Sequence, residues 1–248
     1  MATGRVNVAF VCGGKYHDID YARAQILQAL LETPHLRTKV YADYTAIDEI
    51  TAADCVLTYT VDLVPDDAGA ARLRDFVASG RRWFALHGTN SVLQYVKGKG
   101  WDAPRAVPLY MQTLGSQFLA HPPIAPYTVE VTAPDHPLVA GIAPFSADDE
   151  LYLSELHPPI EVLLHTRFAG TAPGFVAADW SGDEIRPVLY LKPIEAGSVL
   201  YCTLGHARSR YDMQPLMAEY LHEERGSWQT PAFQTLLRRG LAWMAERA

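Results

Sequence analysis

The chain has 248 residues, of which 49% are hydrophobic, and its formal net charge is −7 at pH 7. An acidic chain lacks the positive surface that binds nucleic acids and anionic membranes, so we expect neither as a partner and expect a small-molecule ligand instead. The length and the apolar content are ample for a buried core, and we favour one domain spanning residues 1–248 over two small ones.

The N-terminal half alternates strand-like and helix-like patterns. Short apolar runs rich in β-branched and aromatic residues predict buried strands, and apolar residues recurring at intervals of three and four predict helices. Such alternation is typical of right-handed β-α-β crossovers, which build a parallel sheet with helices on both faces. We therefore predict a flavodoxin-like α/β fold, a three-layer sandwich with a central, mainly parallel sheet. Strands are predicted at 6–11, 39–41, 54–60 and 82–87, and helices at 19–32 and 65–79.

The middle of the chain is less regular. Residues 97–115 carry several glycines and prolines without a clear period, which predicts a long loop that covers the site. Shorter strand-like runs follow, which extend the sheet or form an antiparallel flap, and two helices then close the domain. The predicted strands are 127–132, 150–154, 161–168, 185–192 and 198–204, and the predicted helices are 213–222 and 231–245.

Three cysteines, Cys12, Cys55 and Cys202, fall in or at the end of predicted buried strands. Their spacing fits neither a disulfide framework nor a metal knuckle, which favours a reducing compartment. Residues 1–5 lead directly into the first strand without a signal-type apolar segment, and no apolar run approaches the length of a membrane span. We therefore expect a cytoplasmic protein without membrane contact.

Three of the predicted parallel strands lead into a histidine. His87 ends the run Trp-Phe-Ala-Leu-His, His206 follows a second buried run, and His17 follows the glycines after the first strand. Because ligands of an open parallel sheet bind beyond the carboxyl ends of its strands, we predict that these histidines converge on one polar site. The alternative is that each ring only satisfies buried backbone groups.

The turn around His87 resembles the nucleophile elbow, a sharp strand-to-helix turn that presents a serine or cysteine to a cleft. Here a histidine stands at the tip. In class I glutamine amidotransferases the catalytic histidine is followed two residues later by a glutamate, whereas Arg208 occupies that place after His206. The cysteine and the orienting carboxylate of that chemistry are both missing, so we predict no glutaminase activity.

Short motifs in a fixed order extend the resemblance over nearly the whole chain. They are Gly-Lys-Tyr-His-Asp at 14–18, Leu-His-Gly at 86–88, Gly-Ser-Gln-Phe at 115–118 with His-Pro at 121–122, Asp-His-Pro at 135–137 before Gly-Ile at 141–142, Phe145 with Asp-Glu-Leu-Tyr at 149–152, and Thr-Leu-Gly-His at 203–206. On these motifs the chain is similar to the ThuA-like (trehalose utilisation) family of the class I glutamine amidotransferase-like superfamily. The resemblance implies that scaffold and a role in the metabolism of trehalose or related disaccharides and glycosides, including oxidised 3-keto sugars.

A carboxylate and a phenol stand close together in the fifth motif. Glu150 precedes a predicted strand, and Tyr152 shares its face by the two-residue period of a strand. Such a pair suits hydroxyl recognition or acid–base chemistry, although the acidic run 148–150 also fits a solvated loop. Asp18 is either a hydroxyl ligand or a helix N-cap. The resemblance favours ligand contact for His121 over a place in a surface turn.

The leading hypothesis is an enzyme that acts on a small carbohydrate. A 3-keto group acidifies the neighbouring C–H bonds, so His87 or His206 as a general base would start elimination or isomerisation; hydrolysis is a third reaction class. The competing hypotheses are a non-catalytic sugar-binding or regulatory module and, ranked last, a residual amidotransferase or hydrolase. The catalytic candidates are His87, His206 and Glu150, and the substrate-binding candidates are His17, Asp18, His121 and Tyr152.

The sequence specifies no cofactor. Residues 12–17 lack the third glycine of a dinucleotide-binding turn. Histidines and a carboxylate can bind Zn²⁺ or a similar divalent ion, but no short motif such as His-x-x-x-His occurs, so a metal site would have to be assembled from separate strands. A divalent metal is therefore left open, as is assembly into a homo-oligomer.

Overall fold

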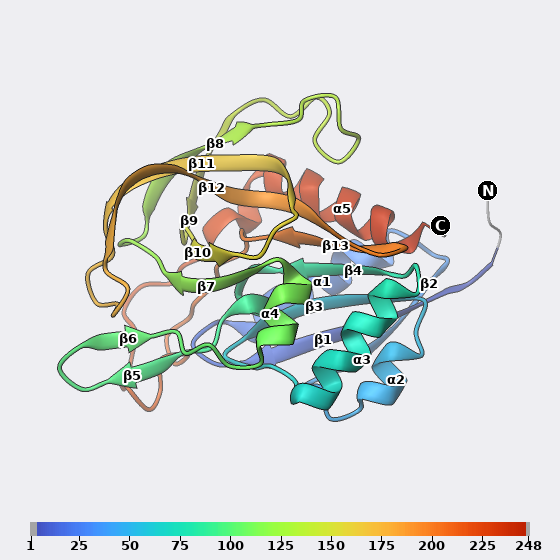
Figure 1. Ribbon diagram of the computed structural model, residues 1–248, viewed down its shortest axis with the longest axis horizontal. Coiled ribbons are helices and arrows are strands. Elements are labelled where there is room, and N and C mark those ends of the chain that lie inside the picture. Colours follow the sequence, from blue (N-terminus) through green and yellow to red (C-terminus); the bar gives the residue numbers. More distant parts are fainter. Residues whose placement is uncertain (1–3, 247–248) are drawn as a thin grey trace.

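The computed structural model describes residues 4–246 and is built around a nine-stranded sheet (Figure 1). Residues 1–3, on which the expectation of a leaderless N-terminus partly rests, lie outside the described residues. In spatial order the strands are β2 (Leu36–Tyr41), β1 (Val6–Gly14), β3 (Cys55–Val61), β4 (Arg82–Leu86), β13 (Gly197–Cys202), β12 (Asp179–Ile194), β11 (Glu161–Thr171), β8 (Ala125–Val131) and β9 (Phe145–Asp149). The helices are α1 (Ile19–Leu31), α2 (Ile47–Thr51), α3 (Asp67–Ala78), α4 (Pro108–Leu114) and α5 (Pro231–Ala245).

The sheet has a parallel half and an antiparallel half. Neighbouring strands from β2 to β13 run parallel, and from β13 to β9 each strand runs antiparallel to the one before it. The antiparallel strands extend the sheet, which is one of the two arrangements the sequence left open. Within residues 4–246, no helix is both long enough and apolar enough to cross a membrane.

Helices cover both faces of the parallel half (Figure 1). Alternate side chains of a strand point to opposite faces, so Phe10 joins the core with α1 and α5, whereas Val11 joins the core with α3 and α4. All seven residues of β3 are buried because both of its faces are covered. The predicted α/β class with a three-layer arrangement is confirmed.

The segment predicted to be a long loop, residues 97–115, is structured instead. β5 (Gln94–Val96) pairs with β6 (Gly100–Asp102) as a hairpin, and α4 follows. Tyr110 and Leu114 of α4 are fully buried against the α3 side of the sheet, and this burial stabilises a helix that is too short to stand alone. Two turns are also too few to show an amphipathic period in the sequence.

The helix predicted at residues 213–222 is wrong, because this segment forms turns. The side chains of Leu216, Met217 and Leu221 are all exposed, so a helix here would have no apolar face to bury. Pro215 also interrupts the pattern, since its ring cannot occupy a helix interior without loss of a hydrogen bond.

The strand predicted at residues 150–154 is wrong in its first three residues. β9 ends at Asp149, and β10 (Leu153–Leu156) begins after a short connection and pairs with β7 (Ser116–Ala120) in a separate two-stranded sheet. The connection between β9 and β10 therefore passes from one sheet to the other, and it carries Glu150 to the carboxyl edge of the parallel strands.

Candidate functional site

The turns after β1, β4 and β13 bring His17, His87 and His206 together, as predicted. The Nε2 atoms of His17 and His87 are 2.9 Å apart, and Nδ1 of His206 lies 3.1 Å from Nε2 of His17. All three side chains are buried. They meet because parallel strands end at the same edge of a sheet.

His87 stands in a strained turn. It follows β4 directly, and its φ of +48° lies in the left-handed region that residues other than glycine seldom adopt. The ring stacks against Tyr59 with a centroid separation of 6.0 Å. Strain of this kind typically persists at functional sites, because the surrounding structure holds a side chain where its chemistry needs it.

Glu150 carries a carboxylate that approaches all three histidines. It is 3% exposed. Its Oε1 lies 3.1 Å from Nδ1 of His206, and its Oε2 lies 3.5 Å from Nε2 of His87 and 3.7 Å from Nε2 of His17. These four side chains, which come from four separate segments, are called the His–Glu cluster below.

Asp149, to which the sequence analysis gave no role, holds the His–Glu cluster in place. Its buried carboxylate accepts four backbone N–H hydrogen bonds of 2.9–3.1 Å. One side chain thereby joins the β9–β10 connection, the turn after β13 and a later turn before α5. The only signal in the sequence was its place beside Glu150 in an acidic run. The donors are the amides of Glu150, Gly205, His206 and Ser227.

Hydrogen bonds on the far side of two rings fix their protons. Nδ1 of His87 lies 2.8 Å from the carbonyl oxygen of Thr203, which only accepts, so this nitrogen carries a proton. Nε2 of His206 lies 2.6 Å from a carboxylate oxygen of Glu224 and is likewise protonated. In the neutral ring of His87, Nε2 then presents a lone pair to the interior of the His–Glu cluster, whereas Nδ1 of His206 faces the carboxylate of Glu150 at 3.1 Å.

The carboxylate that orients His206 comes from Glu224. The sequence predicted that this carboxylate was missing, because Arg208 occupies its expected place, and the structure corrects this. Glu224 also accepts a hydrogen bond of 2.9 Å from Nη1 of Arg208 and one of 2.6 Å from the hydroxyl of Tyr220. Nη2 of Arg208 reaches Oε1 of Glu150 at 3.3 Å, so the arginine links the two carboxylates.

Burial and neighbouring charges set the protonation of the His–Glu cluster. Burial lowers the pKa of His87 to about 3 and that of His17 to about 4, so both rings are neutral at pH 7. Burial also opposes a charge on His206, but the carboxylates of Glu150 and Glu224 outweigh it and raise the pKa of His206 to about 9. The same attraction outweighs burial at Glu150 and keeps its pKa well below the ordinary value.

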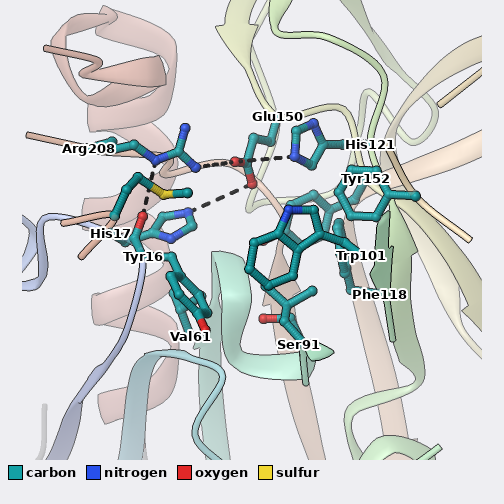
Figure 2. A pocket seen from close by; sticks show the side chains of 13 residues that line it. Tyr16, His17, Val61, Ser91, Trp101, Phe118, His121, Glu150, Tyr152 and Arg208 are labelled. Carbon is teal, nitrogen blue, oxygen red and sulfur yellow. Dashed lines mark hydrogen bonds and ion pairs between the residues drawn. The ribbon is translucent and has the colours of Figure 1, made fainter. Parts of the chain in front are cut away.

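A pocket opens onto the His–Glu cluster (Figure 2). Glu150 forms its polar end, with His17 and Arg208 on one side and His121 on the other. An apolar wall with a few convergent polar groups is the usual form of a small-molecule site. The aromatic part of the lining consists of Tyr16, Trp101, Phe118, Tyr152 and Phe175.

The residues that the sequence analysis singled out occupy different places around this pocket. His87 and His206 belong to the His–Glu cluster but lie beneath the pocket surface, with 0% exposure. Asp18 lies outside the lining: it caps α1 by accepting a 3.0 Å hydrogen bond from the amide of Tyr21, and it pairs with Arg225 at 3.0 Å. Of the two roles that the sequence left open for Asp18, the structure therefore shows the helix N-cap. The residues that do line the pocket are His17, His121, Glu150 and Tyr152.

Among residues 4–246, no thiol lies at the elbow or in the pocket lining. Cys12, Cys55 and Cys202 are buried, and burial raises the pKa of each thiol to about 12. We expect a coupled ammonia assay to detect no glutamine hydrolysis, because no thiolate is present to attack the amide. Ammonia release that disappears in a Cys12→Ser variant would show instead that Cys12 is a nucleophile.

Comparisons with known proteins agree with this fold. A family model described as trehalose utilisation (ThuA) matches residues 7–223. A ThuA-like protein from Bacteroides uniformis shares 15% identity and a TM-score of 0.67, covering 98% of this chain and 93% of that one. One from Parabacteroides merdae shares 14% identity and a TM-score of 0.65, with coverage of 97% and 90%. A cytoplasmic protein from Salmonella typhimurium shares 12% identity and a TM-score of 0.55, with coverage of 98% and 100%. No curated protein sequence matches the chain.

Proposed function

The chain belongs to the ThuA trehalose-utilisation family, and from this premise we propose that it is an enzyme that acts on 3-keto disaccharides or glycosides related to trehalose. The observation that carries the proposal is the His–Glu cluster at the polar end of an aromatic pocket. The family description supports a carbohydrate substrate, and the arrangement of the pocket supports proton transfer on it. The neighbour from Salmonella typhimurium described as cytoplasmic supports placing the reaction in the cytoplasm.

The pocket lacks the carboxylate pair of ordinary glycosidases. Those enzymes hold two carboxyl groups on opposite sides of the scissile bond, roughly 5–9.5 Å apart. Among the described residues that line this pocket, only Glu150 has a carboxylate. Cleavage of a glycosidic bond here therefore needs a mechanism that does not depend on two opposed carboxylates.

A ketone at C3 of the sugar makes such a mechanism available. It acidifies the C–H bond at C2, and a base that removes this proton leaves an electron pair that forms a C1–C2 double bond as the C1–O bond breaks. The leaving oxygen then takes up a proton. Negative charge develops on the ketone oxygen meanwhile, and the guanidinium of Arg208 in the pocket lining stabilises it.

His121 is the histidine best placed to act as the base (Figure 2). Its Nδ1 lies 2.7 Å from the carbonyl oxygen of Pro122 and so carries a proton, which leaves a lone pair on Nε2, 3.6 Å from Oε1 of Glu150. The side chain of His121 is 19% exposed and meets the pocket, whereas those of His87 and His206 are 0% exposed. His121 therefore replaces these two as our candidate base.

Replacing His121 by alanine is expected to lower kcat on a 3-keto disaccharide roughly 10²- to 10³-fold, because a general base of this kind contributes about that much. The melting temperature should change little, since the side chain is partly exposed. Release of the free sugar from a panel of 3-keto disaccharides measures this.

The matched control is His35→Ala, which removes an exposed histidine beside the amino-terminal end of β2, at the opposite edge of the sheet. Its kcat should equal that of the wild type. Equal activity of the His121→Ala variant would contradict the assignment of the base. A wild type that binds these sugars without converting any of them would contradict the enzyme and favour the sugar-binding module.

A further inference from the structure

We infer that the His–Glu cluster binds one divalent transition-metal ion. The ligands are Nε2 of His17, Nε2 of His87, Nδ1 of His206 and the carboxylate of Glu150, and these atoms all lie within 4.8 Å of one another. All four residues are buried. The site is assembled from the ends of three parallel strands and the β9–β10 connection, which is why no short ligand motif marks it in the sequence.

Several of the ligand atoms stand at the spacing of a coordination shell, and the widest pairs, up to 4.8 Å apart, would draw closer on an ion. Metal–nitrogen distances of ~2.0–2.1 Å place neighbouring ligands roughly 2.9–3.4 Å apart in octahedral or tetrahedral geometry. Nε2 of His17 is 2.9 Å from Nε2 of His87 and 3.1 Å from Nδ1 of His206. The carboxylate oxygens of Glu150 lie 3.1 Å from the His206 atom and 3.5 Å from the His87 atom.

The proton positions leave an excess of lone pairs at the centre of the cluster. Nδ1 of His87 donates outward to Thr203, so Nε2 of this neutral ring points inward as an acceptor. Nε2 of His206 donates outward to Glu224, so Nδ1 of His206 becomes an inward acceptor when the ring gives up its second proton to bind a metal ion. The carboxylate of Glu150 adds two more acceptor oxygens. A proton joins only two of these atoms at a time, whereas a metal ion accepts electron pairs from all four ligands at once.

The outward contacts are those that metal-binding histidines usually make. Such a ring donates its second N–H to a backbone carbonyl or a carboxylate, which fixes the ring and raises its basicity. His87 has the carbonyl of Thr203 and His206 has the carboxylate of Glu224, at 2.8 and 2.6 Å. Glu224 is held in turn by Arg208 at 2.9 Å, so a further layer of hydrogen bonds is already in place.

The charged side chains around the His–Glu cluster are also compatible with a bound cation. Glu150 and Glu224 bring two negative charges to the site, and Arg208 brings one fixed positive charge. Three imidazoles and one carboxylate suit Zn²⁺, Mn²⁺, Fe²⁺ or Co²⁺, because Ca²⁺ and Mg²⁺ prefer oxygen ligands throughout. A bound ion would displace the second proton of His206 and balance the remaining negative charge in its place.

The open side of the site faces the pocket, because His17 and Glu150 belong to its lining. In a part of the inference that rests on the proposed function, the free coordination positions would take the ketone oxygen of a keto sugar and its neighbouring hydroxyl oxygen. A metal ion there acts as a Lewis acid and further acidifies the C–H bond beside the ketone. His121, which is not a ligand, stays free to remove that proton.

The metal content of the purified full-length chain tests the inference without any substrate. Stripped of metal and then dialysed against Zn²⁺ or Mn²⁺, the wild type should retain about one equivalent by mass spectrometry. Titration of the stripped wild type with Co²⁺ should produce visible absorption that saturates at the same ratio. The His87→Ala and Glu150→Gln variants should lose the equivalent, and Glu224→Gln should weaken binding roughly 10- to 100-fold.

His121→Ala separates the metal site from the proposed reaction, since it should keep the full equivalent while losing turnover. One equivalent on a wild type that converts no keto sugar would support the metal site and count against the proposed function. No Co²⁺ absorption on the stripped wild type would overturn the metal site, even if the variants failed to fold. Full turnover of a keto sugar by metal-free protein would overturn the Lewis-acid part alone.

Discussion

Glu150→Gln is expected to lower kcat on a 3-keto glycoside roughly 10⁴-fold, the upper end of what one charged group at a reacting centre contributes. The carboxylate lies within 3.7 Å of four histidines, the three of the His–Glu cluster and His121, and within 3.3 Å of Arg208, so its charge sets the state of the whole cluster. Glutamine has the same shape and keeps one acceptor oxygen. The melting temperature should therefore change by only a few degrees, while kcat falls.

The matched control for this variant is Glu155→Gln. Glu155 lies on the same stretch of chain, but its carboxylate pairs with Arg105 at 2.7 Å and does not line the pocket. Its replacement should leave kcat unchanged. Comparable turnover by the two variants would show that the reaction does not use Glu150.

Asp149→Ala is expected to destabilise the chain by roughly 3–5 kcal/mol, because four backbone N–H groups lose their buried acceptor. For a chain of this size, each 1 kcal/mol shifts the melting temperature by about 2–4 °C, so a fall on the order of 10 °C should follow. Thermal unfolding followed by circular dichroism measures it. The three segments that Asp149 joins should also lose protection from hydrogen exchange first.

Asp148→Ala is the matched control, since its side chain is the exposed neighbour on the same strand. Removing an exposed carboxylate should change stability by less than about 0.5 kcal/mol. Equal melting temperatures for the Asp148 and Asp149 variants would show that the hydrogen bonds of Asp149 do not hold the cluster together.

The long, fully buried elements were predictable from the sequence because their burial leaves an unbroken apolar run. β3 and β4 are covered by helices on both faces, and the sequence shows this directly. α4 was not predictable, because a seven-residue helix is held by Tyr110 and Leu114 in the core and not by its own periodicity. The apolar residues at 213–222 misled for the opposite reason: they resemble one helical face, but Leu216, Met217 and Leu221 are exposed.

The residues of the site likewise fall into a predictable and an unpredictable group. Strand direction alone placed His17, His87 and His206 at one edge of the sheet, since that rule needs no knowledge of the turns. The side chains that contact these histidines come from irregular segments, and their positions depend on how those segments fold. Glu224 meets His206 across 18 residues and Arg208 meets Glu150 across 58, and no local period records either contact.

The most direct test of the proposed chemistry is the fate of the C2 proton of a 3-keto glycoside. Proton NMR in D₂O of methyl 3-keto-glucopyranoside, incubated with the wild type, is expected to show loss of the C2–H signal through exchange or elimination. The His121→Ala variant should slow that loss roughly 10²-fold or more. The account is contradicted if the C2–H signal decays no faster with the wild type than without enzyme. This holds whether the wild type cleaves the glycosidic bond or only binds the sugar, because in both cases proton abstraction would not be the function of this site.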